Sequence, residues 1–287
     1  MNWLLIPSPA TGPLVWQGVA AELRAAGHQA VVADLRETLT AQPGWHRRQV
    51  AAAVRSTVDG EAYVVVGHSA AGALLPAVGA ALGGGVLAYL FVDAVLPRPG
   101  RSFADVRPEL MAFVESTSTD ALWTSPWHTW WGVDLAEVVP GLPAGFGAEC
   151  RPLPLAMFRE VAPAGDVPPA RCGYLRFTES YDLAEPRALG WRVVDRPGDH
   201  LDMLVDPAGV TGALLALAGE IAANVRRMSE ETREFTPDRS KIDLSRDPTP
   251  GKPDHLAPDD AGDRPFIDLS RDPNPGKPAH AAPEDDD

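Results

Sequence analysis

A serine stands at the tip of a tight turn between an apolar segment and a segment of small residues. Residues 63–72 read YVVVGHSAAG, with Ser69 at the turn. A strand that enters such a turn and leaves as a helix exposes the serine hydroxyl, and the backbone N–H of Ala70 faces any oxyanion that forms there. The pattern is G-x-S-x-G with Ala71 in the last place. It predicts that Ser69 is a nucleophile.

A serine nucleophile needs a base, and His200 is the best candidate. It lies in the segment RPGDHLDML at 196–204, which we expect to be a loop between the last strand and a helix. A carboxylate must orient the imidazole. Glu179 ranks first because it follows the strand before this loop, Asp93 at the end of an earlier strand ranks second, and Asp182 ranks last. Asp93 has a structural alternative as a turn cap, and Asp182 as the N-cap of a helix.

These segments resemble the α/β-hydrolase superfamily, and most closely its small branch of methylesterases and hydroxynitrile lyases. The resemblance covers most of residues 1–228. It rests on GHS at 67–69 and GDHLDML at 198–204, with support from LIPSP at 5–9 and FVDA at 91–94. It implies an α/β fold with a mostly parallel sheet and a serine hydrolase that cleaves esters.

The resemblance also locates two departures from the family pattern. In the family, the residue after His-Gly at the end of the first strand lends its N–H to the oxyanion, but Pro9 stands there and has no N–H to give. The N–H of Ala10 or the hydroxyl of Ser8 would have to replace it. At the family's acid position this chain has Ser180, which is why the acid has three candidates.

Some chemistries are disfavoured by residues that are missing. The elbow offers a serine rather than the aspartate of dehalogenases and epoxide hydrolases. Residues 1–228 contain no lysine, which the lid of the hydroxynitrile lyases requires. No glycine-rich phosphate loop, dinucleotide fingerprint or cluster of metal ligands is present, so we expect no cofactor and no metal.

Short β-branched runs alternate with alanine- and leucine-rich segments through the first 228 residues, which is typical of parallel βαβ units. The predicted strands are 3–6, 29–32, 62–66, 86–92, 173–177 and 191–194. The predicted helices are 14–26, 46–58, 70–81, 183–189 and 207–226.

The interval from about 97 to 170 breaks this alternation and is too long for a plain loop. It contains four tryptophans and many prolines. We expect a helical lid insertion that covers the carboxyl ends of the strands, where open α/β sheets bind their ligands. Trp127 and Trp130 are its candidate substrate-binding residues, although packing within the lid would equally account for them.

Composition changes after residue 228. Residues 229–287 are rich in proline and carry a net charge of −8 out of the −14 of the whole chain. They hold two 25-residue repeats, 238–262 and 263–287, which share IDLSRDP and PGKP. Too few apolar residues remain to offset chain entropy, so we expect a disordered acidic tail. It is interpreted either as a solubilising linker or as a bivalent motif for a protein partner.

The 39 acidic and 25 basic residues argue against nucleic acid as a partner. The absence of roughly 18–20 uninterrupted apolar residues argues against a membrane partner, and the first residues lack the features of a secretory signal. Two cysteines and no export signal favour a cytoplasmic location, and the arginine- and alanine-rich composition favours a bacterial source. The sequence therefore predicts a cytoplasmic serine hydrolase acting on an ester, less readily a thioester or lactone, of a small to medium apolar substrate. The alternative is a non-catalytic protein of this fold that binds a small ligand or presents its tail to a partner.

Overall fold

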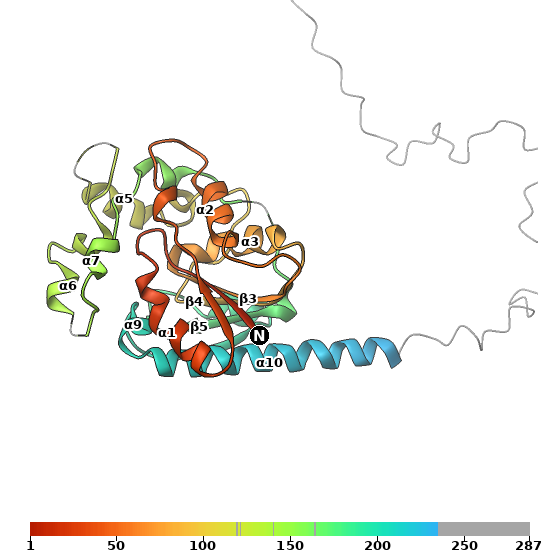
Figure 1. Cartoon of the computed structure of the whole chain (residues 1–287). Helices are drawn as coiled ribbons and strands as arrows, with labels where there is room; N and C mark the ends of the chain where they lie inside the picture. The colour runs from red at the N-terminus through yellow and green to blue at the C-terminus, as the bar shows by residue number, and fades with distance from the viewer. Residues whose placement is uncertain (119, 121, 140, 164, 235–287) are drawn as a thin grey trace, which may run out of the picture. The chain divides into compact units, whose positions relative to one another are not determined.

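A six-stranded parallel sheet forms the centre of the molecule in the computed structural model (Figure 1), which describes residues 1–118, 120, 122–139, 141–163 and 165–234. The strand order is β2-β1-β3-β4-β5-β6, and every neighbouring pair is parallel. The strands are β1 (Asn2–Ile6), β2 (Gln29–Val32), β3 (Tyr63–His68), β4 (Val86–Val92), β5 (Cys172–Arg176) and β6 (Arg192–Asp195).

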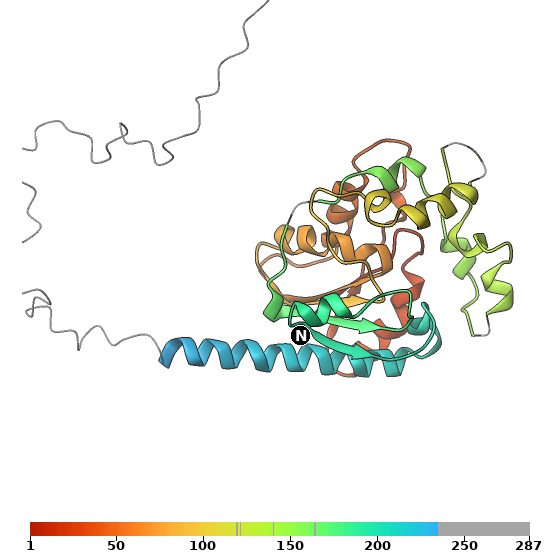
Figure 2. The same cartoon turned by 180° about the vertical axis from the view of Figure 1, so that it is seen from behind.

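Helices cover both faces of this sheet, so the central strands are apolar on both sides. Alternate residues of each strand enter two separate cores. Trp3 and Leu5 of β1 pack with the helices α1 (Leu14–Ala25) and α10 (Pro207–Glu234). Leu4 and Ile6 pack with α2 (Trp45–Val54) and α3 (Leu75–Ala81) on the other face. Figures 1 and 2 show α10 along one face of the sheet and α2 and α3 beyond the other.

The predicted mostly parallel α/β architecture is confirmed, and most element ends differ by only one or two residues. The helix predicted over 70–81 begins as a 3₁₀ turn at Ser69–Leu74 before α3. The helix predicted over 46–58 ends at Val54. The short helices α8 (Ala184–Ala188) and α9 (Asp202–Val205) follow β5 and β6.

The last helix, α10, is longer than predicted and runs to Glu234, so residues 229–234, which were assigned to the tail, are helical. By length and composition, its part from Pro207 to Glu230 would suffice to cross a membrane. Val210, Leu214 and Leu217 are buried in the sheet core, however, and a core helix passes the same test. The remainder of the predicted tail, with both repeats, lies outside the described residues.

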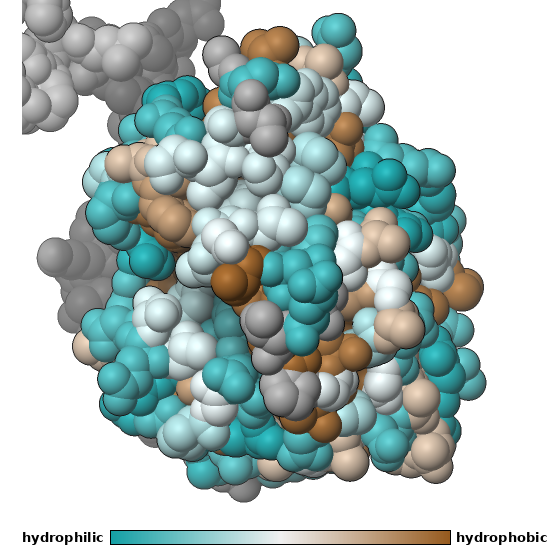
Figure 3. All heavy atoms as spheres, turned by 90° about the vertical axis from the view of Figure 1, so that its left-hand side faces the viewer, coloured by the Kyte–Doolittle hydropathy of each residue, from teal (hydrophilic) through white to brown (hydrophobic). Residues whose placement is uncertain are grey.

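The lid insertion is helical, as predicted, but its helices are short. They are α4 (Phe103–Val106), α5 (Pro108–Ser116), α6 (Leu135–Val138) and α7 (Phe146–Glu149), joined by 3₁₀ turns. A small apolar cluster joins Met111, Val114 and Phe158 of the lid to Ala10 and Trp45 of the body. Figure 3 views the molecule from the lid side, where apolar surface is scattered among polar side chains.

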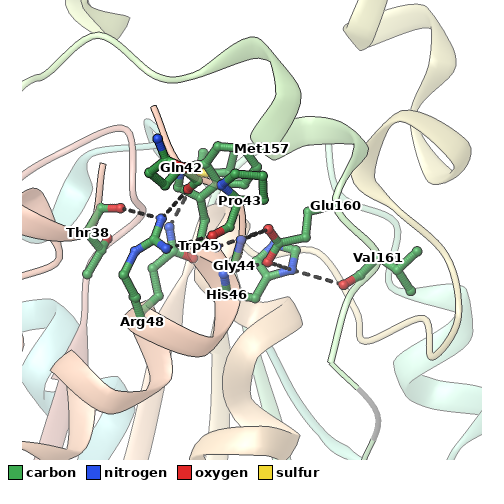
Figure 4. A network of polar contacts seen from close by, with 11 residues as sticks. Thr38, Gln42, Pro43, Gly44, Trp45, His46, Arg48, Met157, Glu160 and Val161 are labelled. Carbon is green, nitrogen blue, oxygen red and sulfur yellow. Dashed lines mark hydrogen bonds and ion pairs between the residues drawn. The ribbon is translucent and has the colours of Figure 1, made fainter. Parts of the chain in front are cut away.

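Two lid glutamates fasten the insertion to the body by capping body helices. Glu160 accepts hydrogen bonds from the backbone N–H groups of Gly44, Trp45 and His46 at the start of α2, at 2.8, 3.0 and 2.8 Å (Figure 4). Glu149 accepts one at 2.7 Å from the N–H of Leu14 at the start of α1. The first N–H groups of a helix have no partner within it, so these carboxylates satisfy exposed donors.

Candidate active site

Ser69 follows β3 directly, in a conformation that few residues other than glycine adopt. Its φ is +55°, in the left-handed region, and its carbonyl accepts a hydrogen bond from Val95 N–H at 3.1 Å. The turn has no room for larger neighbours, because a Cβ on Gly72 would lie 2.1 Å from the Val95 carbonyl oxygen. Such strain persists only where the surroundings enforce it, and it clusters at functional sites. The sharp turn that the sequence predicts around Ser69 is therefore present.

His200 is held by Asp93. Its Nδ1 lies 2.7 Å from Oδ2 of Asp93, whose side chain is fully buried at the end of β4. The carboxylate also accepts the N–H groups of Phe177 and Thr178 and the hydroxyl of Thr178, each at 2.9 Å. Burial raises the pKa of Asp93, but the hydrogen bonds from His200, Thr178 and Phe177 outweigh it and bring the pKa below its usual value. Asp93 is thus an ionised, fixed carboxylate beside the imidazole.

The carboxylate that the structure places at His200 is that of Asp93, whereas the sequence ranks Glu179 first. Glu179 is exposed, and Asp182, one residue before the N-cap Leu183 of α8, accepts the N–H of Ala184 at 2.9 Å. The reason is the direction of the loop after β5. It turns the N–H groups of its first residues toward Asp93 at the end of the neighbouring strand, and the later acidic side chains point outward.

His68 is buried behind the site and supports the loop of His200. Its Nε2 lies 2.9 Å from the His200 carbonyl oxygen, and the two rings are 4.4 Å apart. Burial, followed by the neighbouring His200, holds the pKa of His68 well below its usual value. A neutral imidazole in this position adds no charge next to His200.

Tyr181, which sequence analysis did not single out, completes the surroundings of the nucleophile. Its ring stacks on His200 at 5.7 Å, and its hydroxyl interacts with the Ser69 side chain. Burial raises the pKa of Tyr181 to about 12, against a smaller lowering by Ser69, so the phenol stays protonated. Among the described residues, no hydrogen bond joins Ser69 to His200. Bonds of this kind often tighten only when substrate is present.

The oxyanion side of the site is formed by the end of β1 and the start of the 3₁₀ turn. Ala70 N–H lies directly after the nucleophile, as expected. Ala10 N–H, the replacement considered for the missing donor of Pro9, is directed at Ser8 Oγ at 3.3 Å. The Ser8 hydroxyl accepts this bond and donates none within the described residues. Ser8 is buried and lines the same pocket as Ser69.

The pocket at Ser69 is narrow and mostly apolar, with a volume of about 90 Å³. Trp127 and Trp130, the two tryptophans singled out in the sequence, both line it. An adjoining apolar space of about 70 Å³, here named the annex, shares Pro9 and Ala70 with it. A larger open cleft of about 710 Å³ lies elsewhere, between the loop after β2 and the lid, and none of Ser69, Asp93 and His200 lines it.

No cluster of three or more histidine, cysteine or acidic side chains is placed to hold a metal ion within the described part of the chain. The two cysteines, Cys150 and Cys172, are free and buried. Burial raises the pKa of each thiol to about 12, so neither is poised as a nucleophile. The structure brings His200 and Asp93 into contact, and Tyr181 connects them to the pocket at Ser69, because its ring stacks on His200 and it lines that pocket.

The parallel sheet, the strained turn at Ser69 and the histidine loop give the chain the α/β-hydrolase fold. No family model and no curated protein sequence matches it. Several solved structures match the chain, and the three that follow all have the α/β-hydrolase fold. An extracellular α/β-hydrolase from a Paenibacillus species shares 17% identity at a TM-score of 0.56, over 75% of this chain and 98% of the other.

Two further structures show the same relationship. Tomato methylketone synthase I, complexed with 2-tridecanone, has 17% identity and a TM-score of 0.53, over 77% of this chain and 98% of its own. A pyrethroid hydrolase has 18% identity and a TM-score of 0.54, over 76% and 98%. At such low identity the likeness establishes the fold, and residue roles rest on this chain's own geometry.

Proposed function

We propose that this protein is a serine hydrolase that cleaves carboxylic esters of small to medium apolar acids. The observation that carries the proposal is the buried Asp93 carboxylate, 2.7 Å from His200, next to a strained serine at the mouth of an apolar pocket. A carboxylate in this position fixes the imidazole tautomer and stabilises the imidazolium that forms when it accepts a proton.

In this mechanism, substrate entry brings the Ser69 hydroxyl into hydrogen-bonding contact with His200. His200 accepts the serine proton as Oγ attacks the ester carbonyl, and the tetrahedral oxyanion binds Ala70 N–H and the Ser8 hydroxyl. The imidazolium then gives its proton to the departing alcohol. Water, activated by the same histidine, releases the acid from Ser69 and restores the enzyme.

The size of the substrate follows from the pocket. About 90 Å³ beside Ser69, continued by the annex, holds a short acyl chain and excludes a bulky one without movement of the lid. The lining is dominated by Trp127, Trp130 and neighbouring apolar side chains. Apolar acyl groups should therefore bind by burial of their surface rather than by specific hydrogen bonds.

Hydrolysis of p-nitrophenyl esters with acyl chains of two to twelve carbons tests this proposal. Wild-type turnover that peaks at short or medium chains and vanishes in Ser69→Ala and His200→Ala is the expected result. Equal background rates in all three proteins would overturn it. Circular dichroism on each variant establishes that a lost rate is not lost folding.

A second candidate is a non-catalytic member of this fold that binds a small ligand. Pro9 at an oxyanion position and the lack of a hydrogen bond between Ser69 and His200 among the described residues favour it. A fluorophosphonate probe distinguishes the two, because it labels only an activated serine. Labelling that depends on His200 supports the hydrolase, and binding of ligand without labelling supports the alternative.

A further inference from the structure

Arg107 brings a positive charge into the wall of the pocket beside Ser69. It lies between α4 and α5 of the lid. All of the residues that line this pocket are described, and Arg107 is the one charged side chain among them; the others with polar side chains are Ser8, Ser69 and Tyr181. In such a mostly apolar wall, an anion that docked on the guanidinium would gain more than it would in water.

The guanidinium of Arg107 is only partly used by the protein. Its Nε donates to Glu109 at 2.7 Å, on the outer side, where the Glu109 side chain is 67% exposed. Neither Nη atom has a hydrogen bond to another described residue. The Arg107 side chain is only 31% exposed. Two free N–H groups on one edge of a guanidinium match the two oxygens of a carboxylate.

The position of Arg107 also indicates which part of an ester would meet it. Arg107 and Tyr181 both line the Ser69 pocket and a second, more open pocket of about 220 Å³. Tyr181 stacks on His200, so this is the histidine side of the nucleophile. The annex adjoins Pro9 and Ala70 on the oxyanion side, although it also shares part of its wall, including Arg98, with the open pocket. Its other arginine, Arg101, donates to the carbonyl oxygen of Asp105. The departing alcohol takes its proton from His200 and must therefore leave on the Arg107 side.

We propose that Arg107 binds a carboxylate on the alcohol portion of the substrate, while the apolar acyl chain occupies the annex. The preferred substrate class is thus an acylated hydroxy acid, cleaved to a short apolar acid and a free hydroxy acid. This inference rests on the proposed ester hydrolysis. It assigns the open pocket beside Arg107 and Tyr181 to the hydroxy-acid product. Two carboxylates also line this pocket, but Glu185 is paired with Arg98 and Asp182 accepts the N–H of Ala184.

Two nearby arginines differ from Arg107 in their partners and in the pockets they line. Arg98 also lines the open pocket, but both of its Nη atoms are bound by the two oxygens of Glu185. Arg159 lies in the same lid, pairs with Glu115, is 60% exposed and lines none of these pockets. Arg159→Met therefore removes the same charge from the lid without touching the site, and serves as the matched control.

The test compares three chromogenic butyrate-sized esters. They are p-nitrophenyl butyrate, 3-carboxy-4-nitrophenyl butyrate with a carboxylate on the alcohol, and mono-p-nitrophenyl glutarate with a carboxylate on the acid. Wild type should prefer the second over the first in kcat/KM by roughly tenfold to a hundredfold, the usual range for a charged hydrogen-bonded pair. The preference should collapse to below about threefold in Arg107→Met, survive in part in Arg107→Lys, and be unchanged in Arg159→Met.

Other outcomes overturn the inference. A wild-type preference for the glutarate monoester, or a preference that Arg107→Met leaves intact, contradicts it while ester hydrolysis stands. If no ester is cleaved, the test measures binding instead of kcat/KM. Quenching of tryptophan fluorescence then gives the affinities for 3-(butanoylamino)benzoate and for its neutral carboxamide. Tighter binding of the carboxylate by wild type than by Arg107→Met supports the carboxylate site at Arg107 while the proposed hydrolysis fails, and equal binding of both compounds refutes that site.

Discussion

The sheet and the lid of this protein are stabilised in different ways. The sheet is held by parallel backbone ladders between two apolar cores, with β1 buried from Trp3 to Ile6. The lid has short helices. It is tied to the body by Glu149 and Glu160 at the N-termini of α1 and α2 and by a few apolar side chains such as Phe146, which is buried in the sheet core. A rigid sheet suits groups that must be positioned within a fraction of an ångström, and a tethered lid suits groups that select a ligand.

The candidate residues divide along the same line. Ser69, Asp93 and His200 extend from the carboxyl ends of strands or the loops that follow them, whereas Arg107, Trp127 and Trp130 belong to the lid. The comparison therefore predicts that sheet variants change the rate for every ester, whereas lid variants change the order of preference among esters.

Loss of the carboxylate partner of His200 should have the largest effect. Asp93→Asn should lower kcat by about 10⁴-fold, because the imidazole loses its tautomer and its charge partner. Glu179→Gln, the matched control on the loop after β5, should stay within about twofold. Steady-state kinetics on one ester measures both, and a larger loss in the Glu179 variant would return the acid role to that residue.

Removal of the second oxyanion donor should come next. Ser8→Ala should reduce kcat by roughly a hundredfold with little change in KM, because the hydroxyl acts on charge that develops only in the transition state. Thermal unfolding of the variant provides the control for folding. A kcat equal to that of wild type would show that Ser8 does not face the oxyanion.

A lid variant should move selectivity instead. Trp130→Ala enlarges the Ser69 pocket, so the best p-nitrophenyl ester should become longer by about two or more carbons, as expected from about 0.8 kcal/mol per buried methylene. The chain-length profile provides the measurement. An equal loss of kcat/KM at every chain length would mean that Trp130 affects the rate as the sheet residues do, and would contradict the proposed division between sheet and lid.

The smallest effect is expected on stability, from Glu160, which ties the lid to the start of α2. Burial raises the pKa of Glu160, but the N–H groups of His46, Gly44 and Trp45 together lower it below its usual value. The depressed pKa stabilises the folded state above the ordinary glutamate pKa, and this stabilisation is lost as pH falls through the folded value. Glu160→Gln should cost about 1 kcal/mol near pH 7 and less near pH 3.

Thermal or urea unfolding at the two pH values tests this prediction. Glu115→Gln, which breaks only the exposed pair with Arg159, should cost less than about 0.5 kcal/mol at either pH. A destabilisation by Glu160→Gln that persists unchanged at pH 3 would mean that the carboxylate charge at α2 is not what stabilises the lid attachment.

Local sequence patterns were enough to place the sheet strands, the turn at Ser69 and the loop of His200, because strand periodicity and small turn residues are local signals. The partner of His200 was ranked wrongly because three carboxylates lie near strand ends, and only the direction of the loop after β5 separates Asp93 from Glu179. Tyr181 and Arg107 were not found, because their positions depend on packing of the lid and loops over the sheet. The reach of Glu160 to α2, across 114 to 116 residues, leaves no local signal either.

The central claim is that Ser69 is an activated nucleophile. Mass spectrometry of the protein after treatment with a fluorophosphonate measures this directly. One covalent adduct on the peptide that contains Ser69, formed by wild type and lost in His200→Ala, is the result this account predicts. An unlabelled Ser69, or labelling that His200→Ala leaves unchanged, would contradict it.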